Sequence, residues 1–199
     1  MSIEDIGKRL ECLPAALSDT RFLASQGIGN EIGFHIFAYN AVDEPVVAGY
    51  IPKLVSILQG PERGLQILMI DLYRLILELL ETRGVLKDSL KMEAECGLLT
   101  MEKAVRKIVR PANIVDLIKT KLAAADPDLV LISGVGAAYP LIRSHTILNN
   151  LHDVFDRVPL VMFFPGSYDG HELRLFDILK DDNYYRAFPL LETIRLGEL

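Results

Sequence analysis

One stretch of the sequence indicates the fold class most clearly: VPLVMFFPGSYDGHELRLFDILKDDNYYRAF, Val158 to Phe188. It opens with an apolar run of strand length, Leu160 to Phe164, and a Pro-Gly pair follows that run. An apolar run bounded by turn residues is typical of a strand that is buried on both faces, as parallel sheets require. We therefore expect a buried strand that ends at Phe164, followed by a loop, PGSYDG.

Three further apolar runs of strand length precede this one, at Ile32 to Tyr39, Leu65 to Asp71 and Leu129 to Ser133. Spans with helical periodicity separate them, and another, Leu141 to Leu151, precedes the last strand. Alternation of this kind is typical of βαβ crossover units. We predict an α/β fold: a single compact domain over residues 1–199, with a mainly parallel, doubly wound sheet of about four to five strands and helices on both faces.

Composition narrows the class of protein. The chain has 199 residues, half of them hydrophobic, which is enough to bury a full core. Its formal net charge of -6 argues against a general nucleic-acid binder. No apolar run approaches the length of a membrane span, so we expect no membrane contact and a cytoplasmic location. Its two cysteines, Cys12 and Cys96, fit neither a disulfide framework nor a zinc site.

Polar residues and glycines follow each predicted strand. Because ligands of doubly wound sheets bind at the carboxyl ends of the strands, we expect these residues to share one edge of the sheet. They are Asn40, Asp43, Asp71, Gly134, Gly136, Tyr139, Tyr168 and Asp169.

None of the common catalytic motifs is complete at this edge. The loop after the third strand, GVGAAYP, could aim backbone N–H groups at an anion, but it lacks the lysine of a P-loop and the third glycine of GxGxxG. Asp71 ends its strand like a Walker B aspartate, without a Walker A partner. Neither Ser133 nor Ser144 lies in a nucleophile elbow. We therefore expect no cofactor and no enzymatic activity.

The helical span after the third strand carries several polar side chains. His145, Asn149 and His152 share one face of it, but HExxH and other metal-ligand spacings are missing, so we expect no metal. Capping, packing or hydrogen bonding to the PGSYDG loop is the favoured role for these residues and for Arg143.

Four basic residues, Lys103, Arg106, Lys107 and Arg110, are spaced to lie on one face of a helix within the span Val85 to Val109. A solvated helix face is the favoured interpretation. The alternatives are a docking face for an acidic partner or, less favoured, direct contact with a DNA backbone.

The segment DDNYYR places two carboxylates, an amide, two phenols and a guanidinium in six positions. Adjacent acids can perform acid-base chemistry, but they more often cap helices or pair with arginine, here Arg174 or Arg186. Tyrosine and arginine are also enriched at interface hot spots. We expect a partner-binding surface that comprises Tyr168, Asp169, Arg174, Asp182, Tyr184, Tyr185 and Arg186.

Two stretches also resemble the BrxB family, a small component of bacterial BREX phage-defence systems: LISGVGAAYPLIRSHTILNNLH, Leu131 to His152, and the stretch from Pro159 to Phe188. The similarity extends more loosely through FHIFAYNAVDE, Phe34 to Glu44. The resemblance implies a non-enzymatic adaptor or regulatory component of an anti-phage complex. Its implied partner is PglZ, a protein of the alkaline-phosphatase superfamily, with the ATPase BrxC and the methyltransferase PglX in the wider assembly.

A second hypothesis comes from a different class of protein. In it the chain is a degenerate NTPase-like domain that binds a nucleotide or another anion at the loop after the third strand, around Gly134 and Gly136.

Overall fold

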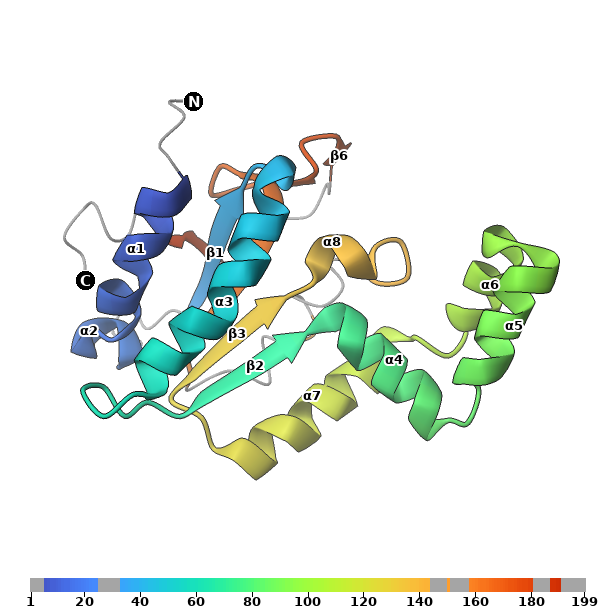
Figure 1. Cartoon of the computed structure of the whole chain (residues 1–199), viewed down its shortest axis with the longest axis horizontal. Coiled ribbons are helices and arrows are strands. Elements are labelled where there is room, and N and C mark those ends of the chain that lie inside the picture. The colour runs from blue at the N-terminus through green and yellow to red at the C-terminus, as the bar shows by residue number, and fades with distance from the viewer. Residues whose placement is uncertain (1–5, 25–32, 144–149, 151–157, 181–186, 191–199) are drawn as a thin grey trace.

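Within the described residues, five parallel strands run side by side in the order β2-β3-β4-β1-β7 (Figure 1). This computed structural model describes residues 6–24, 33–143, 150, 158–180 and 187–190. The strands are β1 Phe34–Tyr39, β2 Ile67–Asp71, β3 Leu129–Ser133, β4 Leu160–Tyr168, β5 Leu173–Leu175, β6 Leu179–Lys180 and β7 Phe188–Pro189. The four apolar runs are thus the four main strands, and the predicted α/β class is confirmed.

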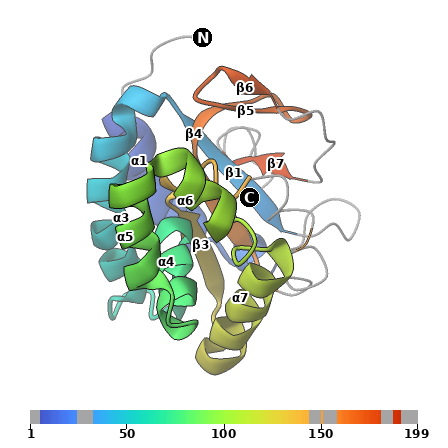
Figure 2. The same cartoon turned by 90° about the vertical axis from the view of Figure 1, so that its right-hand side faces the viewer.

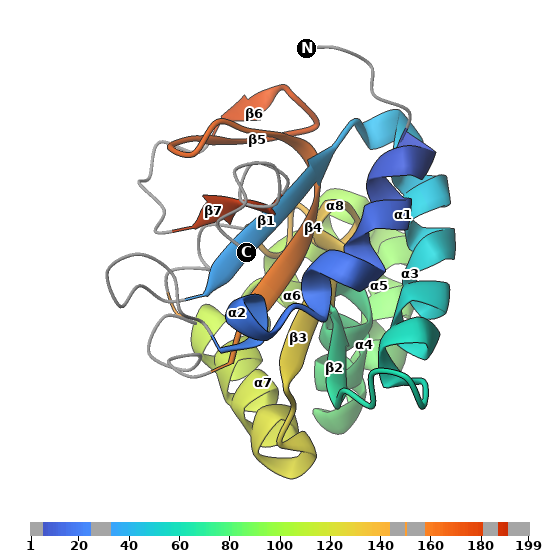
Figure 3. The ribbon, with the colours of Figure 1, turned by 90° about the vertical axis from the view of Figure 1, so that its left-hand side faces the viewer.

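Helices cover both faces of this sheet, as predicted (Figures 1 and 3). On one face, α1, α2 and α3 pack against alternate strand residues such as Phe37 and Phe163. On the other, α4, α7 and α8 pack against the intervening residues, such as Phe34 and Phe164. The helices are α1 Ile6–Leu17, α2 Thr20–Leu23, η1 Ala41–Asp43, α3 Glu44–Gln59, α4 Leu72–Thr82, α5 Leu86–Cys96, α6 Leu98–Val105, α7 Pro111–Ala125 and α8 Val135–Ala138.

β4 is longer than its apolar run. Its residues Leu160 to Met162 pair in parallel with β3, and its residues Leu160 to Pro165 pair in parallel with β1. The strand then continues through Pro165 and pairs in the antiparallel sense with β5, which in turn pairs with β6. The predicted loop PGSYDG is therefore wrong for its first four residues, which belong to the strand. Proline is tolerated here because it lies beyond the last β3 pair, where β4 changes partners.

The helical span Val85 to Val109 forms two helices, because Gly97 ends α5 with a φ of 81° and begins α6. These two helices form a hairpin that lies outside the α4 and α7 layer (Figure 2). α6 ends at Val105. The prediction that Lys103, Arg106, Lys107 and Arg110 share one helix face is therefore wrong, since three of the four lie in the connection to α7.

The loop after β3 also differs from the prediction. Gly134 and the residues that follow it form a single helical turn, α8, immediately after the strand. Most of the helix expected over Leu141 to Leu151, including His145 and Asn149, lies outside the described residues. None of the helices in the described ranges is long and apolar enough to cross a membrane.

His35 is a buried polar residue in β1, between β4 and the edge strand β7. Its ring lies between those of Phe22 and Phe188, at centroid distances of 4.8 and 6.0 Å. Its Nδ1 atom has no hydrogen-bond partner among the described residues. Desolvation therefore lowers the pKa of His35 to about 4 and keeps the ring neutral.

Candidate functional site

The polar residues after the first two strands cap helices. The Asn40 side chain accepts a hydrogen bond from the Val42 N–H at 3.2 Å and so caps η1. The Asp71 carboxylate accepts one from the Arg74 N–H at 3.0 Å and caps α4. Asp43 precedes Pro45 as the cap of α3 but makes no side-chain hydrogen bond there. Asn40 and Asp71 are therefore committed to starting the next helix, as capping residues commonly are.

Gly134 lies directly against the Asp71 carboxylate. It adopts a φ of 71°, and a Cβ placed on it would lie 2.5 Å from Asp71 Oδ1. Glycine is needed both for this backbone conformation and for the close approach. A bound phosphate at this loop would therefore meet a carboxylate, which repels it.

Gly136 is covered by side chains from the end of β4 and from the turn after β5. A Cβ on Gly136 would lie 3.0 Å from a ring carbon of Phe176 and 3.1 Å from the Pro165 ring. Strand ends of doubly wound sheets usually leave a crevice for a ligand at such a position. Here Phe176 and Pro165 occupy the space over the loop.

The segment that carries Phe176 is a small antiparallel extension of β4, which we call the β5–β6 hairpin (Figure 2). Gly166 allows it to form, because any side chain there would clash with the Arg174 carbonyl oxygen. The Phe176 N–H also donates to the Pro165 carbonyl at 2.8 Å. The hairpin is thus anchored to the central strand by backbone contacts.

The Asp169 carboxylate holds the turn between β4 and β5. It accepts hydrogen bonds from the backbone N–H groups of Glu172 at 2.7 Å and His171 at 2.9 Å. These bonds, that from Glu172 most of all, lower the pKa of the carboxyl group. Asp169 was predicted to bind a partner, and the structure gives it a turn-forming role.

Glu172 joins the two ends of the hairpin electrostatically. Its carboxylate pairs with Arg174 and, at 2.9 Å, with Lys180. Hydrogen bonds from Lys180 and then Arg174 lower its pKa. The predicted residue Arg174 is about half exposed and remains reachable on the outer face. The predicted Tyr168 is partly buried, and its hydroxyl donates to the Ala187 carbonyl at 2.7 Å.

η1 and the start of α3 follow the carboxyl end of β1 and lie at the same end of the sheet as the β5–β6 hairpin (Figure 3). These elements carry three exposed apolar residues. Ile178, in the turn between β5 and β6, is 81 % exposed, and Val42 and Val46, in η1 and the first turn of α3, are also exposed. We call Val42, Val46, Arg174 and Ile178 the strand-end surface. Sequence reasoning missed its apolar members, because an apolar residue type taken alone predicts burial.

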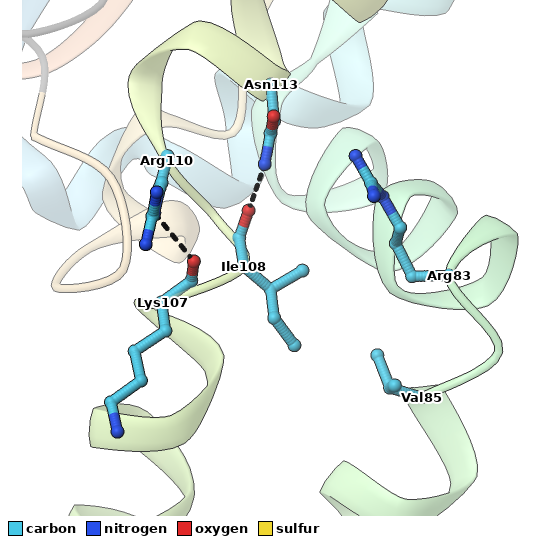
Figure 4. Close-up of a pocket in the computed structure, with 6 residues that line it drawn as sticks. All are labelled: Arg83, Val85, Lys107, Ile108, Arg110 and Asn113. Carbon is cyan, nitrogen blue, oxygen red and sulfur yellow. Dashed lines mark hydrogen bonds between the residues drawn. The ribbon is translucent and has the colours of Figure 1, made fainter.

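The basic residues gather at a second place, the connection between α6 and α7. An open groove of about 440 Å³ separates this connection from the α4–α5 connection (Figure 4). Arg83 and Val85 line one side of it, and Lys107, Ile108, Arg110 and Asn113 line the other. The Asn113 side chain donates to the Ile108 carbonyl at 2.7 Å, and Arg110 Nε donates to the Lys107 carbonyl at 3.0 Å. We call these six residues the basic groove.

A smaller cavity of about 150 Å³ borders the same connection. Arg106 and Arg143 both line it, so two predicted residues that are far apart in the sequence come together. Arg106 is also paired with Glu102, at 2.7 Å. The proximity of Arg143 to the basic connection was not predicted.

The remaining predicted residues are placed as follows. Tyr139 is partly buried against the α4 and α7 core. Outside the described residues lie His145, Asn149, Asp182, Tyr184, Tyr185 and Arg186. Within the described part of the chain, no three His, Cys, Asp or Glu side chains are grouped as a metal site would require.

Comparison with known proteins places the chain in a family. The family model described as BREX protein BrxB matches residues 68–190, which is more than half of the chain. The chain belongs to the BrxB family. A BrxB-family protein from Bacillus cereus (strain H3081.97), named BREX protein BrxB, is 44 % identical over 94 % of this chain and 98 % of its own length.

A second BrxB-family relative comes from Escherichia coli O9:H4 (strain HS). It carries the same name and is 34 % identical over 92 % of this chain and 90 % of its own length. Both names are those of a BREX system component, and neither is the name of an enzyme. No solved structure matches the chain.

Proposed function

We propose that this BrxB-family chain is a non-enzymatic adaptor or regulatory component of a BREX anti-phage complex. In this proposal it binds a PglZ-type partner of the alkaline-phosphatase superfamily through the strand-end surface. The BrxC ATPase and the PglX methyltransferase are the further members of the assembly that the family resemblance implies.

One observation carries the proposal: the β5–β6 hairpin covers the position at which a doubly wound sheet usually binds a small ligand. Phe176 packs over Gly136 on the inside of the hairpin, and Ile178 points to solvent in the same turn. A turn that partly buries one large apolar side chain, Phe176, and exposes another, Ile178, suits a protein contact better than a substrate pocket. Arg174 adds a guanidinium, a group enriched at interface hot spots.

Co-purification with tagged protein tests the proposal. We expect wild-type protein to retain the PglZ-type partner and Ile178→Asp to lose it, because a buried carboxylate at the interface would lack a partner. Thr120→Asp, which adds the same charge at an exposed position of α7 outside the strand-end surface, is the matched control and should retain it.

A second arm examines the C-terminal part of the predicted surface, with Tyr184→Ala and Arg186→Ala. Retention of the partner by the Ile178→Asp and Arg174→Glu variants would contradict the strand-end surface. Failure of wild-type protein to retain the partner would contradict the adaptor role itself.

The alternative, a nucleotide or anion site at the loop after β3, has less support. The Asp71 carboxylate beside Gly134 and the Phe176 ring beside Gly136 both oppose an anion there. A thermal-shift series with ATP, GTP and cyclic nucleotides tests it. We expect no stabilisation; a saturable rise in the melting temperature would favour the alternative, since a ligand that binds the native state must stabilise it.

A further inference from the structure

The α5–α6 hairpin contacts little of the protein to which it belongs. No residue of α5 is buried, and Val105 is the buried residue of α6. Leu90, Leu98 and Leu99 are exposed on it, with Leu99 at 72 %. Figure 1 places the hairpin on the far side of the sheet from α1. The three leucines are exposed on one short hairpin, and nothing in the described structure covers them.

At the base of this hairpin the local charge is opposite to that of the whole chain. From Lys103 to Val115 there are four basic residues and no acidic one, although the chain has a net charge of -6. In the described part of the chain, Arg83, Lys103 and Lys107 have no acidic partner within ion-pair distance. The nearby Lys121, by contrast, pairs with Glu78 at 2.9 Å.

The basic groove has cationic residues on both of its sides. Arg83 lies on one side together with Val85, and Lys107 and Arg110 lie on the other together with Ile108 (Figure 4). The hydrogen bonds from Asn113 and Arg110 to the α6–α7 connection hold one wall in place. A wall that is already ordered loses less conformational entropy when a ligand binds.

We infer that the basic groove and the exposed leucines of the α5–α6 hairpin together dock an acidic amphipathic helix of a partner protein. The cations of the groove match its carboxylates, and Leu90, Leu98 and Leu99 match its apolar face. A nucleic-acid backbone would use the cations but not the leucines. The inference does not depend on the strand-end surface.

Fluorescence anisotropy with the full chain tests this surface. The probe is a labelled helical peptide with leucines on one face and glutamates on the other. We expect saturable, salt-sensitive binding that weakens at least about tenfold in the triple variant Arg83→Glu, Lys107→Glu, Arg110→Glu. The matched control reverses three exposed lysines elsewhere, Lys8→Glu, Lys53→Glu and Lys119→Glu, and should bind within about twofold of wild type.

Two comparison probes separate the apolar part from the charged part. A peptide with every leucine replaced by serine should bind more weakly than the parent peptide. The double variant Leu98→Ser, Leu99→Ser should weaken binding of the parent peptide and leave that of the serine peptide unchanged.

Several results would overturn the inference. These are no saturable binding of the parent peptide, equal losses in the two triple variants, or equal binding of the leucine and serine peptides. Tighter binding of short duplex DNA than of the peptide, lost in the groove variant, would assign the groove to nucleic acid instead. Circular dichroism of each variant checks that its helix content is that of wild type.

Discussion

His35 makes the stability of the protein sensitive to mildly acidic pH. Its pKa is lowered from 6.5 to about 4 by burial, so the native state keeps the ring neutral where the unfolded state takes up a proton. Because the unfolded state binds more protons below pH 6.5, stability falls as the pH falls from 6.5 towards 4. The contribution of His35 is therefore complete above pH 6.5 and is lost through that window.

We predict that wild-type protein loses about 2 kcal/mol of stability between pH 7 and pH 5 relative to His35→Leu, which has no proton to bind. Urea unfolding of both proteins at the two pH values measures this difference. Carboxylates titrate in both proteins, so their contributions to the free energy of unfolding cancel in the comparison. Parallel pH profiles of wild type and His35→Leu would contradict the prediction.

Gly166 is the residue on which the hairpin depends. A methyl group there would clash with the Arg174 carbonyl oxygen, so Gly166→Ala must separate β4 from β5 or shift both. We predict a loss of about 3 kcal/mol or more in the free energy of unfolding, as for other large backbone conflicts. Gly49→Ala, in the exposed part of α3 with open space around it, is the control. It should stabilise the protein by roughly 0.5 to 1 kcal/mol.

At the scale of elements, the α5–α6 hairpin should open independently of the sheet. Its helices bury almost nothing, whereas every residue of β3 is buried. Local opening requires little free energy where few apolar contacts must break. We predict that amides of α5 and α6 exchange with deuterium through local openings that mild denaturant does not promote. Amides of β3 and β4 should exchange through global unfolding; equal protection of both sets would refute this.

The main strands were predictable because burial on both faces leaves an unbroken apolar run in the sequence, as in LVLIS and LVMFF. The continuation of β4 was not, because Pro165 and Gly166 normally end a strand and here mark its change of partners. β5, β6 and β7 were missed because two or three residues are too few for a periodic pattern. The helix break at Gly97 was overlooked because helical periodicity resumes directly after it.

The surroundings of the candidate site residues were only partly predictable from the sequence. Arg174 is exposed, as a partner-binding residue must be. Tyr168 and Asp169 instead have their polar groups bound to the backbone, which the residue types alone cannot reveal. Arg83 lies opposite Lys107 and Arg110 across one groove, and this arrangement depends on where α4 and α6 end. No spacing in the sequence expresses that tertiary relation.

At the scale of the whole molecule, the two cores share one sheet and should unfold together. Phe163 and Phe164 are adjacent in β4, are both fully buried, and belong to opposite faces. We predict that Phe163→Ala and Phe164→Ala each cost about 3 to 5 kcal/mol, typical of a buried aromatic residue. In each variant, fluorescence and circular dichroism should report a single coincident transition. Separate transitions would show that the two faces fold as independent units.

The length of β4 has a mechanical consequence. The strand β4 begins in the middle of the parallel sheet and ends in the β5–β6 hairpin. Gly166 lies within this continuous strand, so no linker separates the two parts. A force applied at the hairpin is therefore transmitted along the backbone directly into the centre of the protein, without a hinge to absorb it. A protein that binds the β5–β6 hairpin therefore also fixes the orientation of the entire sheet.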